Sequence, residues 1–260
     1  MSPAAPRHPD ADARRRPVEQ PHEGVHRFLL ALVTPVVLLA GLAACSKNNT
    51  NPSDLPDGAT LLTQAATASN SISSTHIIID VDQDATHLIT TLPVKRVEGD
   101  LLRTGDAKGS IQLISGAQLI GLDFVVSGDK LYLKYPTGGW QDGGAIKTIY
   151  DPSSILDPNR GIVKLLGGLT SAHTEGTEKI AGTDTYRVAI AVTRQNVSIL
   201  LPLVDSIPTD LTGKVWIDKQ TNRLTKISVD TPANGGAPAG SITAAFSNYD
   251  QPVTVNVPTS

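Results

Sequence analysis

The sequence predicts an α+β domain in which a strongly curved antiparallel β-sheet packs its apolar face against a few helices. Two observations carry this prediction. Over most of the chain, apolar and polar residues alternate with a period of two, which is typical of antiparallel strands with one buried and one wetter face. Two stretches, near 58–73 and 162–169, instead repeat apolar residues at helical spacing. Many strands and few helices indicate the α+β class.

Composition excludes several functional classes. The 260 residues are 40% hydrophobic and 18% charged, which is ordinary for a folded protein and argues against a disordered or multi-span membrane protein. A net charge of -3 argues against a nucleic-acid binder, which needs a clustered basic surface. A single cysteine and six scattered histidines cannot form a disulfide framework or a cysteine-rich zinc site.

The N-terminal 44 residues are interpreted as a lipoprotein signal peptide. Basic residues, Arg14–Arg16 and Arg27, precede an uncharged apolar run over 28–44. The run ends in Leu42-Ala43-Ala44 followed by Cys45, which is a lipobox. We therefore expect Cys45 to become the mature N-terminus, with a diacylglyceryl thioether and a further acyl chain such as palmitate on its amine. Two or three chains anchor a protein stably where one does not.

The alternative for this segment is a transmembrane helix. The apolar run is short for a permanent span, contains Pro35 and stops at a polar stretch, so cleavage is favoured. The expected organisation is a signal peptide over 1–44, a flexible tether over 45–57 and one domain over 58–260. The protein is then expected on the extracytoplasmic face of the cell membrane, in the cell envelope.

The elements of the domain follow in order. Asp57 is placed to cap a helix near 58–73, with Leu61, Leu62 and Ala65 facing inward. The period then changes to two, and Gly, Asp, Ser and Pro separate the expected strands. These strands lie near 76–82, 86–92, 96–103, 109–115, 118–126 and 130–135 and, after a helical middle section, near 185–192, 213–217, 223–230, 241–247 and 252–257.

The middle section differs in its pattern. Asp151-Pro152 and Asp157-Pro158 open short turns or helices. An apolar helical face follows from Ile162, ending at or just after Gly167-Gly168. A second helical stretch is expected near 195–203, cut by Pro202.

Motifs for catalysis or metal binding are missing from the sequence. It contains no Gly-x-Ser-x-Gly elbow, no metal-spaced histidine pair and no paired-carboxylate motif. Asp80, Asp82 and Asp84 alternate along one strand edge but lack the glycine and closing glutamate of a calcium loop, so a solvated face is favoured. His76, His87 and His173 stand alone. We expect no enzyme activity, no cofactor and no metal.

Several short motifs, in order along nearly the whole mature chain, resemble the mycobacterial LppX/LprA/LprF/LprG lipoprotein family, with its LprG-like members the nearest. The motifs are Asp123-Phe124-Val125-Val126, Leu131-Tyr132, Gly139-Trp140, Ile149-Tyr150-Asp151-Pro152, Ile155-Leu156-Asp157-Pro158, Gly161, Val215-Trp216-Ile217, Leu224 and the closing segment 253–258. The stretch 232–240 looks longer than is typical of the family.

This resemblance implies a half-barrel of antiparallel strands with helices on its concave face, enclosing an apolar cavity for the acyl chains of envelope lipids. It implies a carrier of acylated glycolipids or other complex lipids from the inner membrane toward the outer envelope, with a major-facilitator transporter as a partner. It places Ile111 on the lining of the acyl cavity. With its neighbours on the same faces, the expected lining is Ile111, Leu113, Ile120, Leu122, Phe124, Val126, Leu131, Leu133, Ile162, Leu165, Leu166, Val188 and Ile190.

Composition alone does not decide whether the domain contains a cavity. A core of Val, Ile, Leu and Ala with 4% aromatic residues is compatible with a hollow and equally with a solid core. Three classes of function therefore remain: a non-enzymatic lipid carrier, which the resemblance favours, an envelope scaffold with a filled core, and an esterase, which the missing motifs disfavour.

Overall fold

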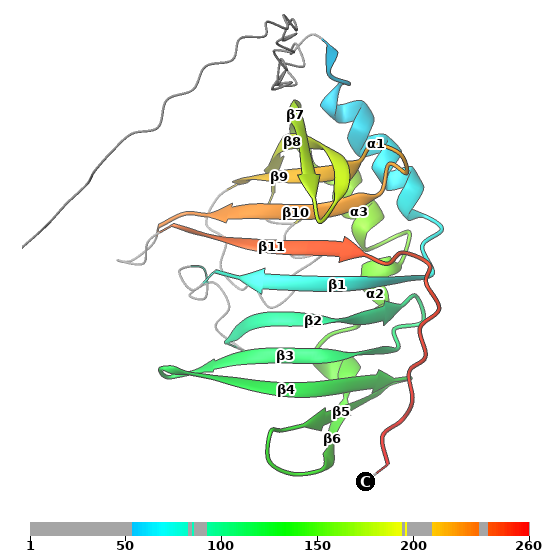
Figure 1. Cartoon of the computed structure of the whole chain (residues 1–260), viewed down its shortest axis with the longest axis vertical. Helices are drawn as coiled ribbons and strands as arrows, with labels where there is room; N and C mark the ends of the chain where they lie inside the picture. The colour runs from blue at the N-terminus through cyan, green and yellow to red at the C-terminus, as the bar shows by residue number, and fades with distance from the viewer. Residues whose placement is uncertain are drawn as a thin grey trace, which may run out of the picture. The chain divides into compact units, whose positions relative to one another are not determined.

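Eleven strands form one antiparallel sheet in the computed structural model, which describes residues 54–82, 85, 93–193, 196, 210–233 and 239–259. The strands are β1 (Ser74–Val81), β2 (Val94–Leu102), β3 (Ala107–Ser115), β4 (Gln118–Ser127), β5 (Lys130–Lys134), β6 (Trp140–Ala145), β7 (Thr170–Ile180), β8 (Thr183–Val192), β9 (Leu211–Asp218), β10 (Leu224–Thr231) and β11 (Gly240–Ser247). Their order is β6-β5-β4-β3-β2-β1-β11-β10-β9-β8-β7 (Figure 1). The curved antiparallel sheet that the sequence predicts is confirmed.

The first and the last strand of the sheet are neighbours in its middle. β1 pairs with β11 from His76 opposite Ser247 to Val81 opposite Ile242. Every other neighbour within the described sheet is also the next strand along the chain. Local hairpins therefore build both sides of the sheet, and one long-range pairing joins them.

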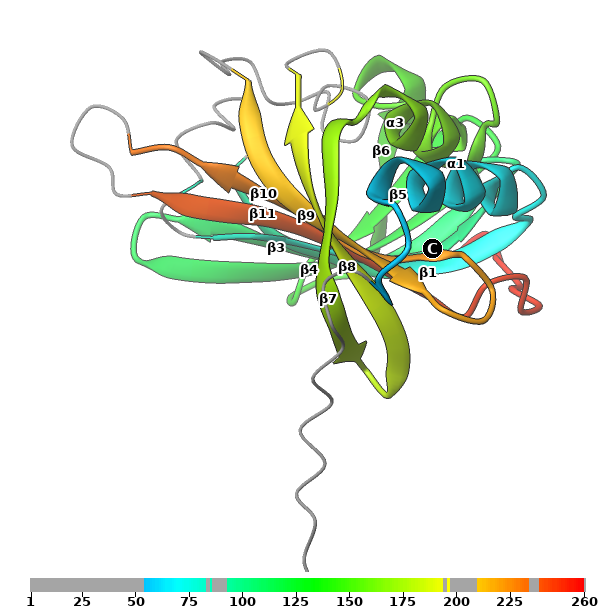
Figure 2. The same ribbon diagram turned by 90° about the horizontal axis from the view of Figure 1, so that it is seen from above.

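Three α-helices lie on one side of this sheet, which we call the concave face (Figure 2). They are α1 (Gly58–Ser69), α2 (Ser153–Leu156) and α3 (Ile162–Gly168), and a 3-10 turn, η3 (Ile146–Thr148), precedes α2. The predicted cap of α1 is confirmed, because the Asp57 carboxylate accepts a hydrogen bond of 2.8 Å from the Thr60 amide. Most of the buried apolar side chains of helices and strands belong to one cluster.

Some expected elements differ from the structure. The first helix ends at Ser69, four residues before the expected boundary. β6 and β7 were not expected, because a glycine-rich strand and an edge strand with mostly exposed side chains show no apolar face. The expected strand at 252–257 is wrong: this segment joins no strand ladder despite its alternating valines. The expected strand at 86–92 and most of the expected helix near 195–203 lie outside the described residues.

Two glycines bring β2 and β3 unusually close. Gly99 pairs with Gly109, between Ile77 on β1 and Phe124 on β4. A Cβ on Gly109 would lie 2.1 Å from the Glu98 carbonyl oxygen and 2.6 Å from the Gly99 Cα. No other residue type fits that separation, so this pair fixes the close approach of the two strands in the middle of the concave face.

Candidate functional site

The concave face carries two parallel rows of apolar residues that cross the sheet from strand to strand. Antiparallel partners point to the same side of a sheet, so the register places their side chains together. The first row runs from β5 to β11 through Leu133, Phe124, Gly109, Gly99, Ile77 and Phe246. The second row runs from β4 to β8 through Leu122, Ile111, Val97, Ile79, Ala244, Ile227, Val215 and Val188. Together the rows form a continuous apolar surface.

An apolar pocket lies where these rows cross the middle strands. Its walls are two residues each of β1, β10 and β11 and one of α2, namely Ile77, Ile79, Ile227, Val229, Ile242, Ala244 and Ile155. The cavity between these side chains is small, about 20 Å³, which is room for roughly one water molecule. Ligand cavities commonly span about 300–1,000 Å³, so a bound chain would have to lie along the rows and not in this pocket alone. The walls offer no charged side chain, so an occupant would be held by apolar contact alone.

The thirteen residues expected to line the cavity all belong to the concave side, in three groups. Those on β3, β4 and β5 include the half-buried Ile111, Leu113, Ile120 and Leu133, whereas Leu122, Phe124, Val126 and Leu131 are buried. Those on α3 and on β8 are also buried: Ile162, Leu165, Leu166, Val188 and Ile190. None of the thirteen lines the pocket at the middle strands, although Ile111, Leu122 and Val188 continue its second row on either side. Their contact with a lipid stays a prediction.

Sequence reasoning did not single out the residues that do line this pocket. Their strands were expected, and Ile227 with Val229 and Ile242 with Ala244 show the alternation of one face. The alternating pattern is absent at Ile77 and Ile79, because Ile78 between them is also apolar. Only the pairing of β1 with β11 brings these residues together.

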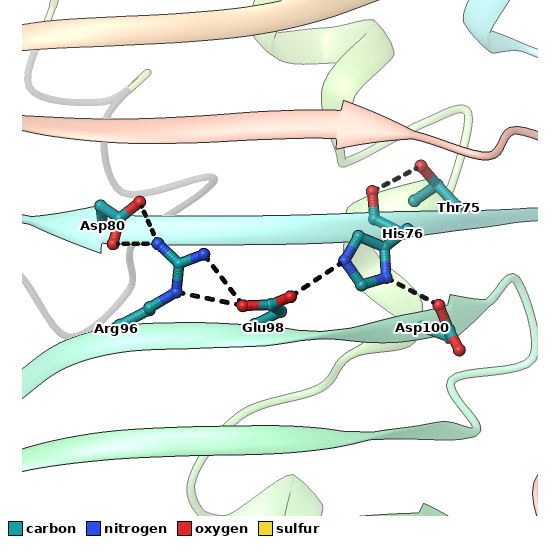
Figure 3. A network of polar contacts seen from close by, with 6 residues as sticks. All are labelled: Thr75, His76, Asp80, Arg96, Glu98 and Asp100. Carbon is teal, nitrogen blue, oxygen red and sulfur yellow. Dashed lines mark hydrogen bonds and ion pairs between the residues drawn. The ribbon is translucent and has the colours of Figure 1, made fainter. Parts of the chain in front are cut away.

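The opposite, convex face of the same strands carries charge. Arg96 binds the Asp80 carboxylate at 2.7 Å and Glu98 at 2.9 Å, and His76 lies 2.8 Å from Asp100 through Nδ1 and 3.6 Å from Glu98 through Nε2 (Figure 3). The hydrogen bonds from the Arg96 guanidinium hold the pKa of the Glu98 carboxyl below its usual value. The network is closed on itself, and its groups are directed away from the pocket.

A second charged network covers the convex face over β7 to β10. Arg187 donates to Glu175 at 2.8 Å and to Glu178 at 3.0 Å, and the Trp216 indole donates to Glu178 at 2.9 Å. The pKa of Glu178 is lowered chiefly by the Trp216 hydrogen bond and further by Arg187. Lys226 lies 4.8 Å from the centre of the Trp216 ring. The charged groups of this network are paired with one another, and the network does not combine the residues that catalysis would need.

Two further observations bear on the kind of site. Among the described residues, no group of three His, Cys, Asp or Glu side chains could hold a metal ion. In the same part of the chain, no helix is long and apolar enough to cross a membrane. The expected lipidation residue, Cys45, lies outside the described residues.

Comparison with known proteins identifies the family. The model of the LppX_LprAFG lipoprotein family matches residues 57–255. The lipoarabinomannan carrier protein LprG of Mycobacteroides abscessus is 34% identical over 236 residues, covering 90% of this chain and 98% of the relative. The protein of the same name from Mycobacterium leprae is 30% identical over 240 residues, covering 91% and 96% of the two chains.

Two solved structures share the fold. The crystal structure of LprF from Mycobacterium bovis matches with a TM-score of 0.67 at 21% identity, covering 78% of this chain and 97% of that one. The crystal structure of LppX from Mycobacterium tuberculosis matches with a TM-score of 0.57 at 22% identity, covering 76% and 97%. The family model spans most of the chain, the relatives align almost end to end, and the curved sheet is shared, so the chain belongs to the LppX_LprAFG lipoprotein family.

Proposed function

We propose that the protein is a lipid-anchored, extracytoplasmic carrier that holds the acyl chains of an envelope lipid or glycolipid on its concave face. The observation that carries the proposal is the pair of apolar rows, which meet in a pocket with only apolar walls. The relatives named lipoarabinomannan carrier protein LprG support it.

The energetics favour an apolar groove for this task. A chain of sixteen carbons exposes about fifteen methylenes at ~0.8 kcal/mol each, so ~12 kcal/mol of protein contact must replace its membrane environment. A few hydrogen bonds could not supply this. The first row extends over six strands and the second over eight, and a bound chain following a row would contact several strands in turn.

The anchor, the direction and the partner complete the proposal. Cys45 carries the lipid anchor, with the cargo moving from the inner membrane toward the outer envelope and a major-facilitator transporter as the partner. Cys45→Ala should release the protein from the membrane or leave it uncleaved without unfolding the domain. Unchanged membrane partitioning and unchanged mass of the variant would contradict the anchor.

A scaffold with a filled core is the competing function. It is supported by the part of the concave face under α1 and α3, where Leu61, Ile162, Leu165 and Leu166 are at most 2% exposed. The carrier and the scaffold differ at Ile111, which is half-buried and continues the row that lines the pocket. A hollow accepts a larger side chain there, whereas a solid core does not.

The test is Ile111→Trp, with Gln112→Trp as the matched control on the exposed, opposite face of the same strand. Organic extracts of the purified proteins are analysed by mass spectrometry, and stability is measured by urea unfolding. The carrier function requires an Ile111 variant that folds normally but retains less lipid, and a control that retains the parent amount. Parent protein without any acyl lipid would overturn the carrier, and a strongly destabilised Ile111 variant would favour the filled core.

The absence of hydrolysis is part of the proposal. No motif supplies a nucleophile and its base, and the charged networks around Arg96 and Arg187 lie on the face away from the pocket. Purified protein should therefore leave acyl esters intact. A hydrolysis rate abolished by one serine substitution would contradict this.

A further inference from the structure

The hairpin that joins β3 to β4 ends in a segment with apolar side chains on both faces. We call residues 113–120 the hairpin tip. Leu113 pairs with Ile120 toward the concave face, and Ile114 pairs with Leu119 toward the convex face. Farther along the same hairpin the convex positions are polar, for example Ser110 opposite Asp123. At the tip, apolar residues therefore oppose each other on the convex face, whereas the apolar Val125 farther along the hairpin lies opposite Lys108.

This tip extends beyond its neighbours in the described sheet. β2 begins at Val94, opposite Leu113, and β5 reaches only to Asp123 of β4 (Figure 1). The Leu119 side chain is 61% exposed, the largest value among the exposed large apolar residues of the described chain. A Cβ added at Gly116 would meet no atom within 4 Å. Among the described residues, the turn and Leu119 are therefore exposed, while Leu113, Ile114 and Ile120 are half-buried.

The tip is also free of charge. No Asp, Glu, Lys or Arg occurs from Gly109 to Leu122. The cations at the adjacent start of β2 are engaged within the protein: Lys95 donates to the Val81 carbonyl at 2.7 Å, and Arg96 binds Asp80 and Glu98. Exposure of such an apolar, uncharged segment to water is unfavourable, whereas the interface of a bilayer can bury its apolar side chains.

We infer that the hairpin tip is a membrane-docking wedge, which enters the surface of the bilayer so that an acyl chain can pass between the bilayer and the concave face. The inference rests on the proposed carrier function. Leu113 and Ile120 are continuous with Ile111 and Leu122 of the second row, which leads to the pocket. An anchor at Cys45 would hold Asp54 within about 30 Å of the membrane, since nine extended residues reach no farther. The bilayer is therefore the apolar partner that is always within reach.

The test uses the full-length protein in phosphatidylcholine vesicles, with a fluorescent label on an introduced cysteine. The one native cysteine, Cys45, has no free thiol once the proposed anchor is attached, so Leu119→Cys and Gln220→Cys each add a single label site, and the parent protein measures any background labelling. Gln220 is the matched control, an exposed residue of the β9–β10 turn at the other end of the strands. We expect phospholipids with a quencher on their acyl chains to quench the label at 119 several-fold and to spare the label at 220. Added salt or anionic lipid should change neither result, because the tip carries no charge.

Four outcomes would overturn the wedge. Absent quenching at 119, or equal quenching at both positions, excludes specific insertion of the tip. An apolar emission from the label at 119 before vesicles are added, at a doubled mass, shows that a second copy covers the tip. The same emission from a monomer shows that the chain covers its own tip. Analysis of the lipid extracted from the same samples distinguishes the two proposals. Protein that contains cargo but whose label at 119 is not quenched refutes the wedge alone. Protein that contains no cargo refutes the carrier.

A functional variant adds a second readout. Leu119→Asp should fold like the parent and retain its cargo, but it should take up a fluorescent acyl lipid from vesicles at least tenfold more slowly. Gln220→Asp should transfer at the parent rate. Equal rates for both variants would refute the wedge as the path of the cargo.

Discussion

The two faces of the sheet are made by the same strands and differ in almost every physical respect. Concave residues such as Val188, Val215 and Ile217 are fully buried and apolar, whereas the convex residues between them, such as Arg187 and Lys214, form ion pairs. Burial of apolar area stabilises far more than a solvated ion pair does. The comparison teaches that the concave face supplies most of the stability and, under the proposed function, the surface for the cargo, while the convex face contributes solubility and local order.

The largest expected effect follows from a truncation on the concave face. Ile217→Ala removes a fully buried side chain of β9 and should lower the free energy of unfolding by about 2–5 kcal/mol, because a cavity is left behind. Urea unfolding followed by circular dichroism measures this. Lys214→Ala, on the other face of the same strand, should cost about 0–1 kcal/mol, and equal losses for the two variants would abolish the distinction between the faces.

The two faces should also differ in how they accept a single methyl group. Gly109→Ala on the concave face pushes a Cβ against the Glu98 carbonyl and should cost about 1–3 kcal/mol of unfolding free energy. Gly121→Ala on the neighbouring strand and the convex face meets nothing within 4 Å and should change stability by less than about 1 kcal/mol. Denaturant titration of both variants is the measurement. An unaffected Gly109 variant would show that β2 and β3 can separate freely.

Acid should weaken the convex face and leave the apolar pocket unaffected. The fold lowers the pKa of Glu98 through Arg96 and that of Glu178 through Trp216, so their stabilisation is complete above the unfolded value of about 4.3. It is lost as the pH falls through the lower folded values. The melting temperature should therefore be flat between about pH 7 and 5.5 and lower at about pH 3.5. A melting temperature that rises in acid would contradict the sign of both shifts.

The smallest effect is expected for a single convex cation. Arg96→Met removes the centre of the network in Figure 3, but its partners Asp80 and Glu98 keep side chains that are 43% and 41% exposed. Water replaces the lost contacts, so the free energy of unfolding should change by about 0–1 kcal/mol. A loss above about 2 kcal/mol in urea unfolding would show that this network holds β1 and β2 together.

Much of the fold could be predicted because one face of most strands is buried. The alternation in β4 and β8 and the helical face of α3 each report contact with the core, and these elements are confirmed. β7 could not be found in this way, since Thr174 is its one fully buried residue and an edge strand has no apolar face to display. The valines at 253–257 misled for the opposite reason, because alternation is necessary for a half-buried strand but does not supply a partner.

The candidate site was harder to predict from the sequence than the fold. Local alternation identifies the face on which Ile227 and Ile242 lie, but not the strand that lies beside them. The walls of the pocket depend on the pairing of Ile79 with Ala244, residues far apart in the sequence. The same alternation could not show which part of the concave face the short helices cover. The resemblance pointed to β3 and β4, where Ile111 and Leu122 line a second pocket with more polar walls, while the apolar pocket is centred on β1 and β11.

The pairing of β1 with β11 determines when the site comes into existence. Six strands on one side and five on the other can form by local hairpins, which close quickly, whereas the junction between them has the highest contact order in the described sheet. A chain that emerges N-terminus first must keep one edge of β1 unpaired until its final strand is available. Four of the seven residues that line the pocket come from these two strands, so the pocket is the last part of the described sheet to be completed. A nascent chain consequently assembles both halves of the sheet before this pocket exists.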